Sequence, residues 1–209
     1  MARSPCHRDE LTTPARWFAL AERVEDSARV NDSSQELGKR AFLSRFAWDG
    51  GHADVWRAFD DGPTFTAIVA ALVEPWRARG ITKVCGIESR GFILGGAAAN
   101  LLGVGFVAIR KQGNLFPGPK HEAEANADYR GNRHVLHIQQ RSVNENDRLV
   151  LVDDWIERGS QAAAANQLVQ TCGATLVGIT VIVDQLADSD RAGLPPVTSI
   201  LKAHELPTL

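Results

Sequence analysis

Cysteine is scarce in this sequence. Only Cys6, Cys85 and Cys172 occur among 209 residues, an odd number without the paired spacing of metal ligands. This content excludes a disulfide framework of the kind that small secreted domains need. Free thiols in a reducing compartment are the simplest account of these cysteines, so we expect a cytoplasmic protein.

Long apolar runs and an excess of charge of one sign are absent as well. The longest apolar stretch, near Ala67 to Val73, is much shorter than the roughly 20 residues that span a bilayer. The formal net charge of −2 gives no cationic surface for nucleic acid. Acidic residues near the N-terminus, without an apolar segment, are untypical of a secretory signal. We therefore expect neither a membrane nor a nucleic acid among the partners.

Several common catalytic and nucleotide-binding motifs are missing. There is no GxxxxGK[ST] loop for nucleoside triphosphates and no serine or cysteine nucleophile motif. The letters from Gly103 to Ala108 match a dinucleotide fingerprint, but they precede an expected strand instead of following one. His134 and His137 lie three residues apart in another expected strand, so they point to opposite faces and make a poor metal pair. We expect no metal site built from protein ligands alone.

Helical and strand patterns alternate along the chain, which predicts a single α/β domain with a mostly parallel sheet flanked by helices. Apolar residues spaced three and four apart predict helices over residues 13–30, 35–46, 63–79, 92–102 and 161–171. Short β-branched runs predict strands over residues 81–87, 106–109, 135–139, 149–152, 176–183 and 197–201. The polar, aperiodic stretch 111–131 predicts a long functional loop.

The stretch from Leu149 to Gln161 combines the features of a ligand site. Four apolar residues lead into Asp153 and Asp154, a loop with a glycine follows, and a helix-favouring run begins at Gln161. In open α/β sheets, ligands bind outside the carboxyl ends of parallel strands, and the free N–H groups of helix N-termini attract anions. A phosphate could bind this loop while the two carboxylates reach hydroxyl groups beside it. An acidic surface turn without a ligand is the alternative.

This stretch resembles the phosphoribosyl pyrophosphate (PRPP) signature of type I phosphoribosyltransferases, in which hydrophobic residues precede two aspartates and a phosphate loop. Residues 86–95, Gly-Ile-Glu-Ser-Arg-Gly-Phe-Ile-Leu-Gly, are similar to the pyrophosphate loop of adenine phosphoribosyltransferases. Residues 107–115 resemble the strand and basic turn before the mobile catalytic loop of that family. The three blocks follow the family's order, and the resemblance covers roughly residues 64–183.

The resemblance implies the type I phosphoribosyltransferase fold for residues 1–209. A helical extension would occupy residues 1–45, a small hood over the base residues 46–62, and the core residues 63–209. The hood region is rich in aromatic residues and glycine, which suits a flat ligand under a flexible flap. It lacks the proline-rich segment that is usual in the adenine enzymes.

The resemblance also implies roles for individual residues. Asp153 and Asp154 would hold the ribose hydroxyls and stabilise positive charge on the ribose. Arg90 and Lys111 would bind the leaving pyrophosphate. The 5′-phosphate would be received by the backbone of a loop made of Glu157, Arg158, Gly159, Ser160 and Gln161.

The phosphate loop departs from the family's pattern of a small residue followed by Thr-Gly-Gly-Thr. It retains only the first glycine of that pattern, at Gly159. Arg158 could replace a lost hydroxyl contact with a charge-assisted one, or it could point to solvent.

The base would lie between the hood and the end of the signature strand. Phe46 and Trp48 are the hood aromatics expected to contact it. Trp155 and Ile156 follow the aspartate pair and would form the floor under the base, unless they are core residues.

The acid that protonates the base is a glutamate beside a tyrosine on the family's lid. Asp128 precedes Tyr129 at the corresponding place and is the acid expected here. Glu122 and Glu124 are alternatives.

The implied reaction transfers a phosphoribosyl group from PRPP to a purine or purine-like base and releases pyrophosphate. Mg²⁺ would arrive with PRPP, without a dedicated protein cage, and the enzyme would be a homodimer. Two rival interpretations keep the fold. One is a sensor of PRPP or a nucleotide that has lost catalysis, which the altered loop and hood favour. The other is a hydrolase of PRPP or a nucleotide, in which water replaces the base.

Overall fold

The computed structural model describes residues 33–113, 115–125 and 134–208. The chain divides into two units, Met1–Asp32 and Ser33–Leu209, and the described residues all belong to the second. The helix predicted over residues 13–30 and the expected lid acid Asp128 lie outside the described residues. A single domain over residues 1–209 therefore stays a prediction.

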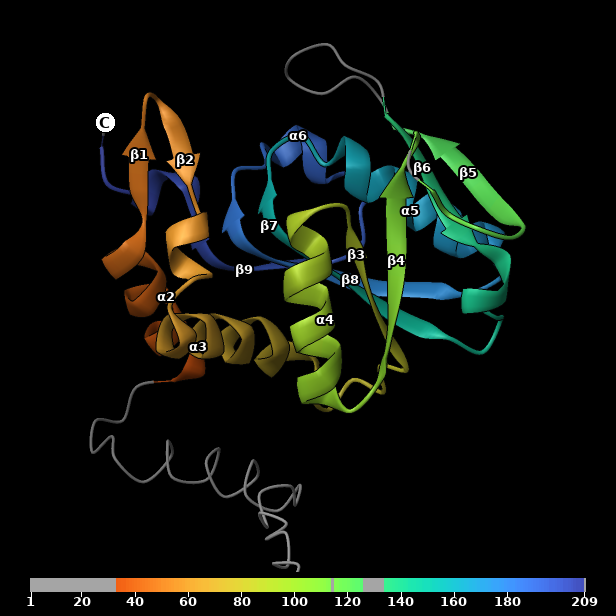
Figure 1. The fold of residues 1–209 in the computed structure, drawn as a ribbon, viewed down its shortest axis with the longest axis horizontal. Coiled ribbons are helices and arrows are strands. Elements are labelled where there is room, and N and C mark those ends of the chain that lie inside the picture. Colours follow the sequence, from red (N-terminus) through yellow and green to blue (C-terminus); the bar gives the residue numbers. More distant parts are fainter. Residues whose placement is uncertain (1–32, 114, 126–133, 209) are drawn as a thin grey trace, which may run out of the picture. The chain divides into compact units, whose positions relative to one another are not determined.

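The centre of the described unit is a seven-stranded sheet in the order β5-β6-β4-β3-β7-β8-β9 (Figure 1). The strands β4, β3, β7, β8 and β9 pair in parallel, whereas β6 runs antiparallel to both β4 and β5. The mostly parallel sheet expected from the sequence is confirmed. The strands are β3 (Lys83–Ile87), β4 (Gly105–Lys111), β5 (Lys120–Glu124), β6 (Val135–Gln139), β7 (Arg148–Ile156), β8 (Thr175–Asp184) and β9 (Val197–Lys202).

Helices cover both faces of the sheet (Figure 1). On one face lie α2 (Ser34–Arg45), α3 (Gly62–Val73) and α4 (Arg90–Leu102), whose buried side chains form one core cluster with Val150 and Val152 of β7. On the other face α5 (Ser160–Thr171) packs against Leu149 and Leu151 of the same strand. Successive side chains of a strand point to opposite faces, so a strand covered on both sides is apolar throughout. The run Leu149–Val152 is such a strand.

A small hairpin precedes the sheet. Its strands β1 (Ala47–Asp49) and β2 (His52–Asp54) pair antiparallel within the range predicted for the hood. The Trp48 indole Nε1 donates to the Pro207 carbonyl oxygen at 2.7 Å, so the hairpin is tied to the C-terminal segment. Short helical elements complete the fold: 3₁₀ turns at Trp56–Ala58, Glu74–Trp76, Gln140–Ser142 and Ala203–Glu205, and the helix α6 (Asp188–Arg191).

The helix predicted over residues 63–79 is wrong in its second half. The helix α3 ends at Val73, and Glu74–Trp76 forms a 3₁₀ turn. Pro75 is the reason, because proline cannot donate the hydrogen bond that an α-helix needs at that position. The apolar spacing continued through Trp76, which is buried, so periodicity alone overestimated the helix.

Two boundaries near the site also differ from the prediction. The signature strand does not end at Val152 but runs to Ile156, because the longer neighbour β8 continues to pair with it. The stretch 111–131, expected to be a loop, contains the strand β5. This edge strand buries only Ala123 of its five residues, so it carries no apolar alternation from which to predict it.

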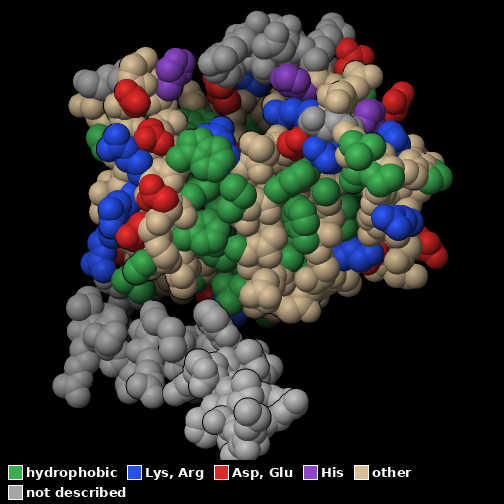
Figure 2. Space-filling view, in the orientation of Figure 1, with side chains coloured by type: hydrophobic (Ala, Val, Ile, Leu, Met, Phe, Trp, Pro, Cys, Tyr) green, Lys and Arg blue, Asp and Glu red, His purple; other side chains and the backbone are tan. Residues whose placement is uncertain are grey.

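Apolar side chains are visible on the surface over α4 and β4 (Figure 2). Ile93 and Leu101 of the helix and Phe106 of the strand are the exposed large apolar residues there.

Among the described helices, none combines the length and the apolar character needed to span a membrane.

Two adjacent glycines of α4 give a test of how closely this helix packs on the sheet. A Cβ at Gly95 would lie 2.7 Å from Cε2 of Phe106, whereas a Cβ at Gly96 would meet nothing within 4 Å. Gly96→Ala should therefore raise the free energy of unfolding by about 0.5–1 kcal/mol through higher helix propensity. Gly95→Ala should lower it by about 1–3 kcal/mol through overpacking. Urea denaturation measures both changes, and a shift of the same sign in the two variants would contradict the packing.

Candidate active site

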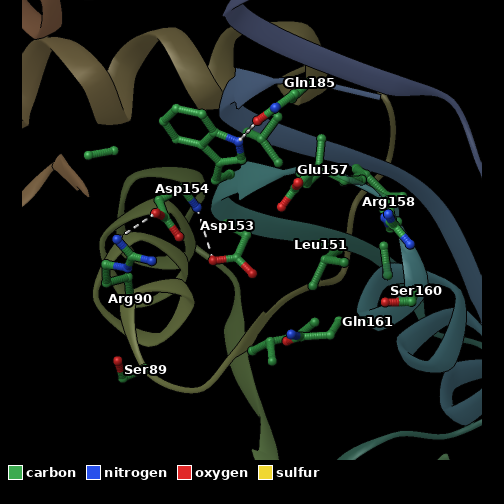
Figure 3. A pocket seen from close by; sticks show the side chains of 18 of the residues that line it. Ser89, Arg90, Leu151, Asp153, Asp154, Glu157, Arg158, Ser160, Gln161 and Gln185 are labelled. Carbon is green, nitrogen blue, oxygen red and sulfur yellow. Dashed lines mark hydrogen bonds and ion pairs between the residues drawn. The ribbon is translucent and has the colours of Figure 1, made fainter. Parts of the chain in front are cut away.

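A cavity of about 670 Å³ opens at the carboxyl ends of β3, β4 and β7. It brings together residues that the sequence places far apart. Of the predicted site residues, those that line it are Trp48, Arg90, Lys111, Asp153, Asp154, Trp155, Ile156, Glu157, Arg158, Gly159, Ser160 and Gln161. Figure 3 shows how the side chains from β7, the following turn and the start of α4 surround it.

The parallel pairing of β3 with β7 places two of the predicted motifs side by side. Gly86 pairs with Val152, so the turn after β3 lies beside the aspartate pair at the end of β7. A Cβ at Gly86 would lie 2.0 Å from the Gly91 carbonyl oxygen, and a Cβ at Gly91 would lie 3.2 Å from Oδ1 of Asp153. Both positions require glycine because the N-terminal turn of α4 lies directly against the ends of these strands.

One of the two adjacent aspartates, Asp154, forms an ion pair with Arg90. Nη1 of Arg90, the first residue of α4, lies 3.1 Å from Oδ2 of Asp154 (Figure 3). This oxygen is buried and has no aligned hydrogen bond, so the contact with Arg90 is one of charge alone. The Asp154 amide donates to Oδ1 of Asp153 at 2.9 Å, which fixes the two carboxylates relative to each other.

Asp153 is held in an unfavourable charge environment. Burial, followed by the neighbouring Asp154 carboxylate, raises its pKa well above the usual value, and Arg90 opposes this only in part. A positive charge in the cavity would therefore stabilise the ionised form of Asp153 more than it would stabilise an ordinary surface carboxylate.

The turn between β7 and α5 presents unused backbone donors to the cavity. Gly159 precedes the helix with φ of 68°, in the left-handed region. Within the described part of the chain, the amides of Arg158, Gly159, Ser160 and Gln161 make no hydrogen bond to another group. Free amides at the N-terminus of a twelve-residue helix form a site for an anion. Such amides are what the predicted role of this turn requires, and that role stays a prediction.

Glu88 fixes the second basic residue of the site. Its carboxylate accepts from Nε of Arg110 at 3.2 Å and from Nη2 at 3.1 Å, a two-point contact. The same carboxylate accepts from the Lys111 amide at 3.2 Å. The loop after β3 and the end of β4 are therefore joined, and Lys111 is held at the cavity.

Only some of the residues predicted to contact the base line the cavity. Trp48, Trp155 and Ile156 line the cavity, but Phe46 does not. Phe46 is buried, with its ring centroid 5.4 Å from that of Phe42 and 5.2 Å from that of Trp48. Its backbone caps the C-terminal end of α2 and its side chain lies in the core, so Phe46 does not reach the cavity.

Some residues that line the cavity were not singled out from the sequence. The hairpin contributes Gly51, His52 and Ala53, and the end of β8 contributes Gln185. Gln185 accepts from the Trp155 indole Nε1 at 2.8 Å. The rule that ligands lie at strand ends could have indicated Gln185, because it lies two residues after the strand predicted over residues 176–183. The hairpin residues lie within the range predicted for the hood, but the sequence did not single them out individually.

A metal cage made by the protein is not found in the described residues. None of their His, Cys, Asp and Glu side chains gather in groups of three or more around a common point. The acidic groups at the cavity are instead the adjacent carboxylates of Asp153 and Asp154, with one oxygen of Asp154 lacking a hydrogen bond. They suit a hydrated cation that brings further oxygen ligands with its substrate.

Comparison with known proteins places these features in one family. The phosphoribosyl transferase domain family matches residues 55–197. An adenine phosphoribosyltransferase of Maricaulis maris is 39% identical over 157 residues, which cover 73% of this chain and 87% of that protein. The chain belongs to the type I phosphoribosyltransferases, a family of enzymes.

Solved structures agree with this assignment. An adenine phosphoribosyltransferase from Giardia lamblia in complex with 9-deazaadenine has a TM-score of 0.70 and 29% identity, covering 84% of this chain and 100% of that one. The enzyme from Trypanosoma brucei in complex with AMP, pyrophosphate and ribose-5-phosphate has a TM-score of 0.73 and 26% identity, covering 84% and 83%. The fold expected from the sequence is therefore confirmed.

Gly159 gives a test of the anion site. An alanine there would have an unfavourable positive φ, and its Cβ would lie 2.7 Å from Cδ1 of Leu194. Gly159→Ala should weaken PRPP binding about tenfold, equivalent to roughly 1.4 kcal/mol, because the turn must change shape. Isothermal titration calorimetry with PRPP measures this change.

Gly80→Ala is the matched control for this variant. Gly80 has φ of 64°, and the nearest atom to its Cβ position is 3.8 Å away, in Arg148. Both variants should lose about 1–2 kcal/mol of stability from the left-handed backbone. Only Gly159→Ala should lose affinity for PRPP, and equal affinities in the two variants would count against an anion site at this turn.

Proposed function

We propose that this protein transfers the phosphoribosyl group of PRPP to a purine or purine-like base and releases pyrophosphate. The observation that supports this most is the arrangement of one cavity. It has unused amides at the start of α5, two carboxylates at the end of β7, and Arg90 and Lys111 on the side of β3 and β4. These groups match the three parts of PRPP, which are a 5′-phosphate, a ribose and a pyrophosphate.

The carboxylates are suited to the charge that develops in this reaction. As the bond from C1 of the ribose to pyrophosphate breaks, positive charge builds on the ribose ring. Asp153 is buried beside Asp154, which raises its pKa, and positive charge on the ribose would favour its ionised form more than an uncharged ribose would. The pair would thus bind the hydroxyls in the ground state and stabilise the transition state further.

Arg90 would exchange partners when PRPP binds. In the free protein its guanidinium pairs with Asp154. A pyrophosphate offers more negative charge and a geometry that suits the guanidinium fork, so it would compete for Arg90 and leave Asp154 for the ribose. Lys111, positioned by the contact of its amide with Glu88, would add a second positive charge.

The base would lie between the hairpin and Trp155. Trp48 and His52 on one side and Trp155 on the other line the cavity, which suits a flat heterocycle. Both solved structures described above are of adenine phosphoribosyltransferases, which favours a purine for this chain. Asp128, outside the described residues, stays the proposed acid, with Glu122 and Glu124 as alternatives.

Mg²⁺ bound to PRPP would neutralise part of the pyrophosphate charge and make it a better leaving group. The residues that would face it are Asp153 and Asp154, through bound water or directly. The homodimer implied by the family resemblance also stays a proposal, which analytical ultracentrifugation would test.

Incubation of the protein with PRPP, Mg²⁺ and a panel of bases tests the proposed reaction. We expect a nucleotide and pyrophosphate to form in equal amounts with a purine, and none with the pyrimidines uracil and orotate. Pyrophosphate release without a base would indicate a hydrolase instead. PRPP binding without turnover with any base would indicate a sensor.

Replacement of both acids, Asp153→Asn with Asp154→Asn, should abolish the stabilisation of the ribose charge. We expect kcat to fall by about 10²-fold or more, the range found when one electrostatic group is removed from an active site. The melting temperature should not fall, because the variant removes the repulsion between adjacent buried charges. Steady-state kinetics and thermal unfolding measure both.

Asp60→Asn, at an exposed position away from the cavity, is the control for this variant and should retain full kcat. Turnover of the double variant close to that of the control would refute the assigned role of the two acids.

A further inference from the structure

The strand β8 ends in a carboxylate that is fully enclosed by protein. The side chain of Asp184 has 0% exposure and lies 2.6 Å from Nζ of Lys202 and 2.7 Å from Nη2 of Arg191. It also accepts from the Leu186 amide at 2.9 Å. Burial alone would raise the pKa of Asp184, but hydrogen bonds from Lys202 and Arg191 outweigh burial and hold the pKa below its usual value. The group is therefore an ionised centre with two cations attached.

These contacts fix the segment Gln185–Leu194, here called the support segment. Arg191 is the last residue of α6, so its bond to Asp184 closes the segment back onto the strand from which it leaves. The same guanidinium reaches the Leu186 carbonyl oxygen at 3.4 Å. Lys202, which pairs with Asp184 in the ladder between β8 and β9, ties the segment to the last strand.

The support segment packs against the turn between β7 and α5 that contains Gly159. The Cβ position of Gly159 is 2.7 Å from Cδ1 of Leu194 and 3.3 Å from Cδ2 of Leu186. The Gln185 amide donates to the Ile156 carbonyl oxygen at 2.8 Å, at the point where the turn begins. Both ends of the turn are thus held from outside by the same segment.

The Gln185 side chain extends this support to the expected base site. Its Oε1 accepts from the Trp155 indole, and Figure 3 shows Gln185 directed toward β7 above the aspartate pair. The turn itself has few bonds of its own, since its amides face the cavity without partners among the described residues. The shape of the turn therefore depends mainly on the support segment that packs against it.

We infer that the support segment, held by the ion cluster of Asp184, Arg191 and Lys202, positions the Gly159 turn for the phosphate. Asp184, Arg191 and Leu194 are positioning residues in this scheme, since they act on the substrate only through the turn. The inference rests on the proposed function for its substrate, PRPP. A small displacement of such a turn lowers binding strongly, because anion recognition by amides depends on their alignment.

A second buried carboxylate in the chain allows a matched comparison. Asp147 lies 2.7 Å from Nζ of Lys83, accepts from Oγ1 of Thr82 at 2.9 Å and accepts from the Asn144 amide at 2.9 Å. It has the same kind of environment as Asp184 but precedes β7, at the opposite end of the strand from the turn. None of its partners lines the cavity.

The experiment compares Asp184→Asn with Asp147→Asn in the full chain. Both variants should melt at a lower temperature, because each weakens the charge-assisted hydrogen bonds between a buried carboxylate and its partly exposed cationic partners. Only Asp184→Asn should raise KM for PRPP, by about tenfold, which corresponds to roughly 1.4 kcal/mol, with a smaller change in kcat. Hydrogen exchange of the amides of residues 163–167, the first hydrogen-bonded amides of α5, measured by mass spectrometry without ligand, should become faster in Asp184→Asn alone.

Leu194→Ala is the second variant, and it decides the question if Asp184→Asn does not fold. It removes the apolar contact behind Gly159 and leaves the ion cluster intact, so it should raise KM for PRPP and hasten exchange in the same residues. The inference would be overturned if Asp184→Asn and Leu194→Ala, or whichever of them folds, showed the exchange of the wild type and a KM within twofold of it. Equal changes in Asp147→Asn would overturn it as well, because the effect would then be one of general stability.

The exchange measurement needs no substrate, so it separates the two proposals. If the wild-type protein forms no nucleotide, the proposed function fails, while faster exchange at residues 163–167 in Asp184→Asn would still show the positioning. If the wild type is active and the two variants match it in both measurements, the positioning fails alone.

Discussion

The close approach of α4 to the ends of β3 and β7 is the constraint on which the site depends. It exists because Gly86 and Gly91 have no side chains at a point where the backbone of the turn nearly touches the strand. This approach places Arg90 within reach of Asp154, although the two residues are 64 positions apart in the sequence. A side chain at either glycine would separate Arg90 from the two aspartates at the end of β7.

The parts of the fold that rest on buried apolar periodicity could be predicted from the sequence. The run Leu149–Val152 and the alanine-rich start of α5 are examples, since burial on both faces leaves a clear pattern. The strand β5 could not be predicted, because an edge strand that buries one side chain has no such pattern. The end of α3 was missed for the opposite reason: buried Trp76 continued the helical spacing beyond the proline that ends the helix.

The candidate site was predictable where it depends on the order of motifs and less so where it depends on packing. The residues from Asp153 to Gln161, with Arg90 and Lys111, reach one cavity because strand ends meet at one edge of a parallel sheet. Phe46 was misassigned because an aromatic residue in a glycine-rich segment looks the same in sequence whether it faces a ligand or the core. Gln185 was not singled out because its place depends on how far β8 extends and on its bond to Trp155, neither of which the sequence shows.

The hydrogen bond between the Trp48 indole and the Pro207 carbonyl oxygen bears on how the protein should be tagged for purification. It ties the segment around Pro207 to the hairpin, whose residue Trp48 lines the cavity. A fusion partner attached to this segment would act on the hairpin through the bond, so the choice of fusion site in an expression vector bears on any measured catalytic rate.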